Sequence, residues 1–120
     1  MRPSFRVVAF LCILAAPSAA QEFHPGKLFA VARSTKEVIE FGGNGTAPVP
    51  VVPTSAGMIG PWGLAFGPDG ALYVSAVGSN RIFRFDATGA QTDFGSSFLI
   101  APRSLAFRPN GNLYVADSGL

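Results

Sequence analysis

Few residues of this 120-residue chain have the types and spacing that acid–base or nucleophilic chemistry needs. The single histidine, His24, lies two residues after Glu22 in what we expect to be a solvated terminus, whereas a catalytic base has to be held rigidly by a partner. Glu37 and Glu40 flank two apolar residues of an expected strand, so they point to opposite faces and share no proton. We therefore assign no catalytic and no cofactor-binding residue within these positions.

The sequence does contain a stretch that occurs twice, 41 positions apart. Pro61-Trp-Gly-Leu-Ala-Phe-Gly-Pro-Asp-Gly-Ala-Leu-Tyr-Val-Ser75 returns as Pro102-Arg-Ser-Leu-Ala-Phe-Arg-Pro-Asn-Gly-Asn-Leu-Tyr-Val-Ala116, with nine identical positions. Residues 28–41 form a weaker copy that aligns with residues 72–85 by apolar character. A period of about 40 residues with short strands and glycine turns is typical of β-propeller blades.

The apolar runs predict an all-β fold of four-stranded antiparallel blades. No window after residue 20 sustains a helical apolar period without a glycine or proline. Leu-Ala-Phe and Leu-Tyr-Val are apolar on both faces, as expected for a sheet covered on both sides by neighbouring blades. Val49-Pro-Val-Val52 fits an outer strand, where proline is tolerated. The other expected strands are 27–32, 37–41, 62–66, 71–76, 81–85, 104–107 and 112–116.

The turns between the first two strands of each repeat are expected to be tight hairpins. Pro68-Asp69-Gly70 and Pro109-Asn110-Gly111 combine a proline that presets φ with a glycine that tolerates positive φ. Asp69 is then either a structural turn residue or a calcium ligand.

Residues 1–20 read as a helical signal peptide. Arg2 and Arg6 precede a short apolar run, and small residues precede an expected cleavage after Ala20. We expect a secreted or periplasmic protein with no membrane attachment after cleavage; an uncleaved interfacial anchor is the alternative. Cleavage removes Cys12, the only cysteine, and leaves seven basic against seven acidic residues. A net charge of zero gives no reason to expect a nucleic-acid partner.

Residues 21–120 are expected to form an incomplete propeller. The repeats divide it into a partial first blade (24–60), a full blade (61–101) and a half blade (102–120). Propellers close with four to eight blades. We expect the chain to be a fragment of a longer reading frame; ring assembly from several short chains is the alternative.

The repeated segment, followed by Ser79-Asn-Arg-Ile-Phe-Arg-Phe-Asp86, resembles an NHL-type repeat. The wider group includes gluconolactonase-like and streptogramin-lyase-like six-bladed propellers. The resemblance covers residues 61–120 well and 24–41 weakly.

The resemblance implies a divalent cation, with Ca²⁺ possible in the full-length protein, held by Glu, Asp and Asn oxygens from several blades. The oxygen-bearing loop residues here are Asn44, Asn80, Asp86 and Asp117, of which Asn80 and Asp117 are the candidate metal ligands. The aspartate of the repeat is present at Asp117 but replaced by Ala76 in the full blade. We therefore expect Asp117 to cap the turn of its own blade.

Trp62 and Arg103 occupy one repeat position that varies while the scaffold repeats. They are the candidate binding surface; blade-to-blade packing of Trp62 is the other interpretation. We expect an exported binding scaffold for a protein, peptide or glycan. The alternative is the N-terminal part of a metal-dependent lactonase or lyase whose catalytic residues lie beyond Leu120.

Overall fold

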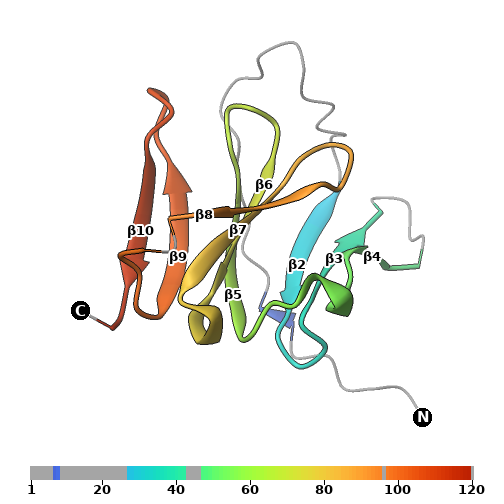
Figure 1. The fold of residues 1–120 in the computed structure, drawn as a ribbon. Helices are drawn as coiled ribbons and strands as arrows, with labels where there is room; N and C mark the ends of the chain where they lie inside the picture. Colours follow the sequence, from blue (N-terminus) through green and yellow to red (C-terminus); the bar gives the residue numbers. More distant parts are fainter. Residues whose placement is uncertain (1–6, 9–26, 43–46, 96, 120) are drawn as a thin grey trace.

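The strands form three antiparallel sheets that follow one another along the chain (Figure 1). The computed structural model describes residues 7–8, 27–42, 47–95 and 97–119. Blade 1 contains β1 (Val7–Val8), β2 (Leu28–Ala32), β3 (Glu37–Phe41) and β4 (Val49–Val52). Blade 2 contains β5 (Pro61–Phe66), β6 (Leu72–Ala76), β7 (Arg81–Phe85) and β8 (Gln91–Phe94). Blade 3 contains β9 (Pro102–Phe107) and β10 (Leu113–Asp117). The all-β prediction is confirmed.

The strand register confirms the alignment of the weak copy with the full blade. In blade 1 Leu28 pairs with Phe41, and in blade 2 Leu72 pairs with Phe85. The two hairpins therefore place equivalent residues opposite each other, although few of these residues are identical. Val49–Val52 pairs with β3 as an outer strand, as its sequence predicts.

Among the described residues after Ala20, one strand was missed by the sequence analysis. β8 (Gln91–Phe94) closes the outer edge of blade 2, and all four of its residues are exposed. A solvent-facing edge strand needs no apolar face, so its sequence carries no apolar run to detect. Short edge strands with a charged residue, such as Asp93 here, also resist pairing with other chains.

Helices are short in the described part of the chain. It contains two single 3₁₀ turns, η1 (Thr54–Ala56) and η2 (Val77–Ser79), and no helix there is long and apolar enough to cross a membrane. The helix expected in residues 1–20 does not include Val7 and Val8. These two are extended and pair with β2 as β1, the place that β5 takes beside β6. Such pairing satisfies backbone groups at the edge of β2. The rest of the expected signal peptide lies outside the described residues.

Two apolar layers hold the three sheets together. The layer between blades 1 and 2 is the larger, and it includes Val31, Val38, Met58, Val74 and Phe83. Phe29 and Phe66 meet edge to face across it, with ring centroids 5.0 Å apart. Each fully buried aliphatic side chain of this layer, such as Val31, stabilises the fold by about 1.5–3 kcal/mol. The layer between blades 2 and 3 joins Ala71, Tyr73 and Ile82 to partly buried residues, namely Leu99, Leu105, Phe107, Leu113 and Val115.

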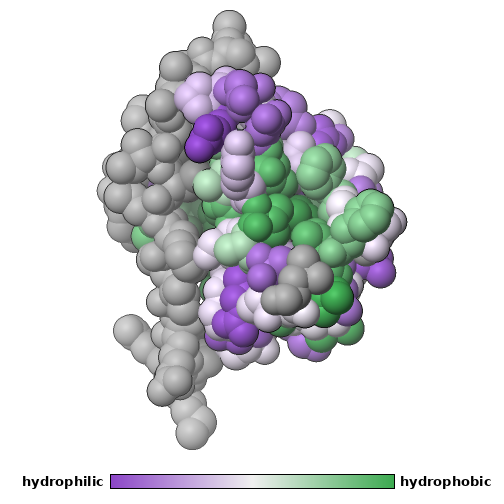
Figure 2. Space-filling model, turned by 90° about the vertical axis from the view of Figure 1, so that its left-hand side faces the viewer, coloured by the Kyte–Doolittle hydropathy of each residue, from purple (hydrophilic) through white to green (hydrophobic). Residues whose placement is uncertain are grey.

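Blade 2 is therefore covered on both faces, as predicted from its non-alternating strands. All five residues of β6 are buried. The equivalent strand β10 alternates between half-buried and exposed residues, because only one face of blade 3 has a neighbour within the described residues. Figure 2 looks onto the other face, where apolar surface lies between polar surface above and below. Tyr114 is 49% exposed on this face, whereas its counterpart Tyr73 is 6% exposed.

The two predicted hairpins, β5–β6 and β9–β10, have the same geometry. In the first, the N–H of Gly70 donates to the carbonyl of Gly67 at 3.0 Å, and the N–H of Gly67 donates to the carbonyl of Ala71 at 2.9 Å. Gly70 has φ of 78°, the left-handed conformation that favours glycine. Arg108 to Asn112 repeat the pattern in blade 3 with Gly111 at 86°.

Candidate ligand-binding surface

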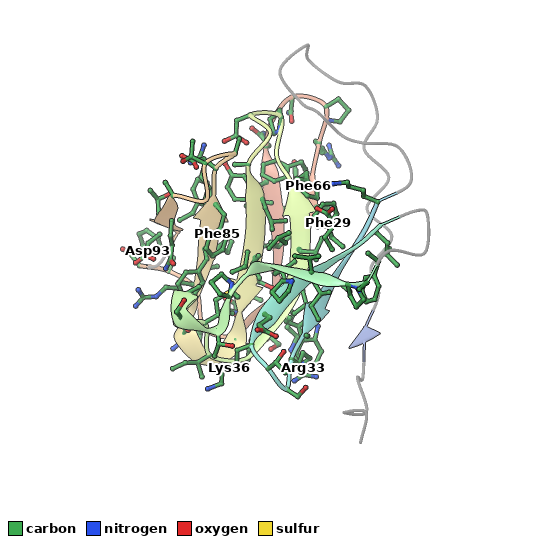
Figure 3. All side chains as sticks on the ribbon, turned by 90° about the vertical axis from the view of Figure 1, so that its right-hand side faces the viewer. Phe29, Arg33, Lys36, Phe66, Phe85 and Asp93 are labelled. Carbon is green, nitrogen blue, oxygen red and sulfur yellow. The ribbon has the colours of Figure 1, made fainter. Side chains whose placement is uncertain are left out.

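The two ends of the sheets carry different kinds of loop. Because neighbouring strands run antiparallel, the start of β5 lies beside the end of β6, and Pro61 pairs with Ala76. The β2–β3, β4–β5, β6–β7 and β8–β9 connections therefore gather at one end, here called the Trp62 end. The β5–β6 and β9–β10 hairpins lie at the other, here called the hairpin end. Figure 3 shows Arg33 and Lys36 together at the end of the molecule away from Phe29 and Phe66.

Trp62 contacts one arginine from each flanking blade. The Cζ of Arg33, which follows β2, lies 3.9 Å from the ring centroid of Trp62. The Cζ of Arg103, in β9, lies 4.3 Å from the same ring. Since blade 2 lies between blades 1 and 3, the guanidinium groups approach the indole from its two sides. Trp62 and Arg103 are half-buried, and Arg33 is exposed.

The structure thus brings together the two residues predicted from sequence and adds a third. Arg33 was missed because its counterparts in the other repeats, Val77 and Ser118, carry neither a charge nor an aromatic ring. The repeat therefore does not mark this position as a site. The alignment of residues 28–41 with 72–85 contained the signal: it places Arg33 directly after the second strand, at the end where the first strand of the next blade begins. Trp62 packs between blades and also reaches this surface, so the two interpretations of Trp62 are compatible.

The backbone beneath these side chains is closely packed. The hydroxyl of Ser75 accepts the N–H of Gly63 at 2.9 Å and donates to the carbonyl oxygen of Arg103. A Cβ on Gly63 would come closer than 3.0 Å to that carbonyl oxygen and 3.2 Å from Ser75 Oγ. Only glycine therefore allows β9 to approach β5 so closely. Ser75 is the buried polar residue of this core, and its hydrogen bonds offset the cost of burying it.

The two candidate metal ligands both hold the β8–β9 connection. Asn80 has φ of 52°, and its Oδ1 accepts the N–H of Ala101 at 3.2 Å. Asp117 accepts the N–H of Ile100 at 2.7 Å and, through its other oxygen, the N–H of Gly119 at 2.8 Å. Asp117 thus caps its own turn, as expected. Across the described ranges, no three His, Cys, Asp or Glu side chains lie close enough to hold a metal ion. A role of Asn80 or Asp117 in metal binding stays a prediction.

Asp86 and Asn44 complete the set of oxygen-bearing loop residues. Asp86 Oδ1 accepts the Thr88 hydroxyl at 2.6 Å and the N–H groups of Thr88 and Ala90, both at 2.9 Å. These bonds, that of the Thr88 hydroxyl foremost, lower the pKa of Asp86. Asn44 lies outside the described residues, as does His24.

A second polar cluster lies at the hairpin end. Asp69 Oδ2 accepts Arg84 Nη2 at 2.8 Å and the Tyr73 hydroxyl at 3.0 Å, while Oδ1 accepts the N–H of Ala71 at 3.1 Å. Partial burial acts to raise the pKa of Asp69, but the hydrogen bonds from Arg84, Ala71 and Tyr73 outweigh it and leave the pKa lowered. Burial and the bond to Asp69 raise the pKa of Tyr73. Both oxygens of Asp69 therefore serve the turn and the strands beside it.

Solved structures with a similar fold include two lyases. The chain matches a catalytically inactive virginiamycin B lyase from Staphylococcus aureus, crystallised with quinupristin, at a TM-score of 0.64 and 22% identity over 78% of this chain and 31% of that one. It matches a streptogramin B lyase at a TM-score of 0.64 and 16% identity over 97% of this chain and 35% of that one. No protein-family model and no curated protein matches the sequence.

The chain spans about a third of the length of these two structures. At this level of identity the likeness shows the fold, which is that of a β-propeller, and leaves the chemistry to be argued from the residues.

Proposed function

We propose that this chain is a propeller-type binding module, built of NHL-like repeats, that takes a protein, peptide or glycan ligand at the Trp62 end. The observation that carries the proposal is the contact of Arg33, Trp62 and Arg103, three side chains from three successive blades. The repeated residues around them are accounted for by packing and turns. The variable position of the repeat is the one that reaches an end surface, as expected where a shared scaffold presents a specific site.

The test uses the full chain and arrays of defined peptides and oligosaccharides. Trp62→Ala is expected to abolish whatever binding the unaltered chain shows, and Trp62→Phe to retain part of it. Tyr114→Ala is the matched control, because Tyr114 is another aromatic residue beside an arginine, but it contacts Arg108 of the hairpin end. Circular dichroism confirms that each variant is folded. Binding that survives Trp62→Ala would contradict the proposal.

Export belongs to the same proposal. The expected signal peptide places the module outside the cytoplasm, in the periplasm or the medium, after cleavage behind Ala20.

A metal-dependent lactonase or lyase is the second candidate, and the fold it shares with two lyases favours it. Its test adds quinupristin and a divalent cation such as Ca²⁺ to the full-length protein and follows loss of quinupristin with and without EDTA. Consumption that EDTA abolishes supports the enzyme. A melting temperature unmoved by EDTA, with quinupristin intact, contradicts it.

A further inference from the structure

Arg33 and Arg103 differ from most other cations in the described part of the chain. Arg81 forms an ion pair with Asp93 at 2.7 Å, Arg84 with Asp69 at 2.8 Å, and Lys27 with Glu40 at 2.5 Å. Within the same described ranges, Arg33 and Arg103 have no carboxylate partner within 4.0 Å. Their positive charge is therefore not neutralised by the fold.

The guanidinium groups also keep hydrogen-bond donors for a ligand. Arg103 donates its Nε to Ser118 Oγ at 2.8 Å, which fixes the group and leaves its two terminal nitrogens. Arg33 is exposed and is positioned by the indole at 3.9 Å. A guanidinium held flat against a ring loses less freedom on binding, and its fork of N–H groups matches a carboxylate.

The acidic groups nearby are already engaged. Both oxygens of Asp117 accept backbone N–H groups, at 2.7 and 2.8 Å. Glu37 accepts the hydroxyl of Thr54 at 3.3 Å. Lys36 lies in the same hairpin turn as Arg33 and adds a further positive charge. The local charge balance at this end is positive although the expected processed chain is neutral.

The indole itself offers little to a sugar or an aromatic ligand. A ring that stacks on tryptophan needs a free face, and at Trp62 a guanidinium approaches from each side. Ligand recognition here therefore depends on the edges of the two arginines. Trp62 acts as the spacer between them, at 3.9 Å from one and 4.3 Å from the other.

We propose that Arg33 and Arg103 bind two carboxylates of an extended acidic peptide across the edge of Trp62. This rests on the binding function proposed above and names its ligand class. Alternate side chains of an extended peptide lie on one side of it, about 7 Å apart. That spacing suits two guanidinium groups with one indole between them, so the peptide pattern is Glu-X-Glu or Asp-X-Asp.

Trp62 is the only tryptophan of the chain, so its fluorescence reports on this site alone. The experiment titrates the full chain with acetyl-Gly-Glu-Gly-Glu-Gly-amide and, separately, with the same peptide carrying Gln for Glu. The Glu peptide is expected to change the emission of Trp62 saturably, and the Gln peptide to leave it unchanged. Raising NaCl from about 0.05 M to about 0.5 M is expected to weaken binding, because salt screens exposed charges.

Variants distinguish the positive charge of Arg33 and Arg103 from positive charge elsewhere on the protein. Arg33→Gln and Arg103→Gln are each expected to weaken binding about tenfold, the loss of one charge-assisted contact. Arg103→Lys keeps the charge without the forked N–H groups, and its affinity for the Glu peptide is expected to lie between those of the unaltered chain and Arg103→Gln. Arg108→Gln is the matched control: Arg108 also lies over an aromatic ring, Tyr114 at 4.8 Å, but at the hairpin end, and its loss is expected to leave binding unchanged.

Three results would overturn the inference. The first is equal binding of the Glu and Gln peptides, and the second is unaltered binding by both Arg33→Gln and Arg103→Gln. The third is tighter binding of an oligogalacturonate than of the Glu peptide, which would assign the site to acidic glycans. If a neutral peptide or glycan changes the emission of Trp62 and the Glu peptide does not, the binding function stands and only its acidic ligand class falls.

Discussion

Arg103 lies over the ring of Trp62 at 4.3 Å although the two residues occupy the same position of successive repeats. Each side chain points from its own first strand toward the preceding blade: Trp62 toward Arg33, and Arg103 toward Trp62. The two contacts therefore share a direction, toward the preceding blade, although they meet different repeat positions there, and what varies from blade to blade is the side chain at this position of the first strand.

Removing this contact is expected to cost little stability. Arg103→Gln should lower the free energy of unfolding by about 0.5–1 kcal/mol, the usual contribution of a partly exposed cation–π pair. Urea denaturation followed by the fluorescence of Trp62 measures it. A loss far above this range would mean that Arg103 is mainly a structural residue.

Gly63→Ala is expected to be much more damaging. The added Cβ would meet the carbonyl oxygen of Arg103 at less than 3.0 Å, and neither backbone can move without disturbing Ser75. We expect a loss of about 2 kcal/mol or more in the free energy of unfolding. The control is Ser104→Ala, the equivalent position of blade 3, which is exposed and should change stability by less than about 0.5 kcal/mol. Equal effects at both positions would refute the close approach.

Asp69 predicts a specific loss of stability in acid. Its pKa is lower in the fold than in the unfolded chain, so its ionised form stabilises the fold. That contribution is complete above the unfolded value of 3.8 and disappears as the pH falls through the folded pKa. Asp69→Asn should therefore reduce stability at pH 7 and flatten its fall in acid, as thermal melts between pH 7 and pH 2 would show. A variant with an unaltered acid profile would argue against the Arg84 and Tyr73 bonds.

The open face of blade 3 predicts self-association. Ala106 and Tyr114 are exposed there, whereas their counterparts Ala65 and Tyr73 are buried against blade 3. The chain on its own should therefore self-associate as its concentration rises, and Tyr114→Glu should reduce this association in sedimentation experiments. Thr92→Glu adds the same charge on the exposed strand β8 and serves as control. An unaltered chain that stays monomeric as its concentration rises would contradict this prediction.

Cleavage of the expected signal peptide changes the mass of the exported protein, so intact mass tests it directly. Expression in a host with a general export pathway is expected to yield a chain beginning at Gln21. Intact-mass measurement of the exported fraction decides it. A product that retains Met1 would favour the uncleaved anchor.

The fold was largely predictable because its signals are local and repeated. Two-sided apolar strands such as β6 predict burial between neighbours, and Pro-Asp-Gly predicts its hairpin. β8 escaped because an exposed outer strand needs no apolar run in its sequence. The site was half predictable: the variable repeat position pointed to Trp62 and Arg103. Arg33 required knowledge of which turn of blade 1 meets the start of β5, and Ser75 required knowledge of which backbone it bridges.

The tight contact of Gly63 with Arg103 also sets the direction in which further sheets would extend. At the inner strands β5 and β9 the absence of a side chain lets two backbones nearly touch. One strand farther out in blade 2, at β6, the ring of Tyr73 packs against that of Phe107 of β9, with centroids 4.9 Å apart. Two sheets that lie closer together at Gly63 than at Tyr73 meet at an angle. Each further sheet would therefore be rotated about an axis near the inner strands. One hydrogen atom in place of a methyl group thus contributes to the curvature of the whole molecule.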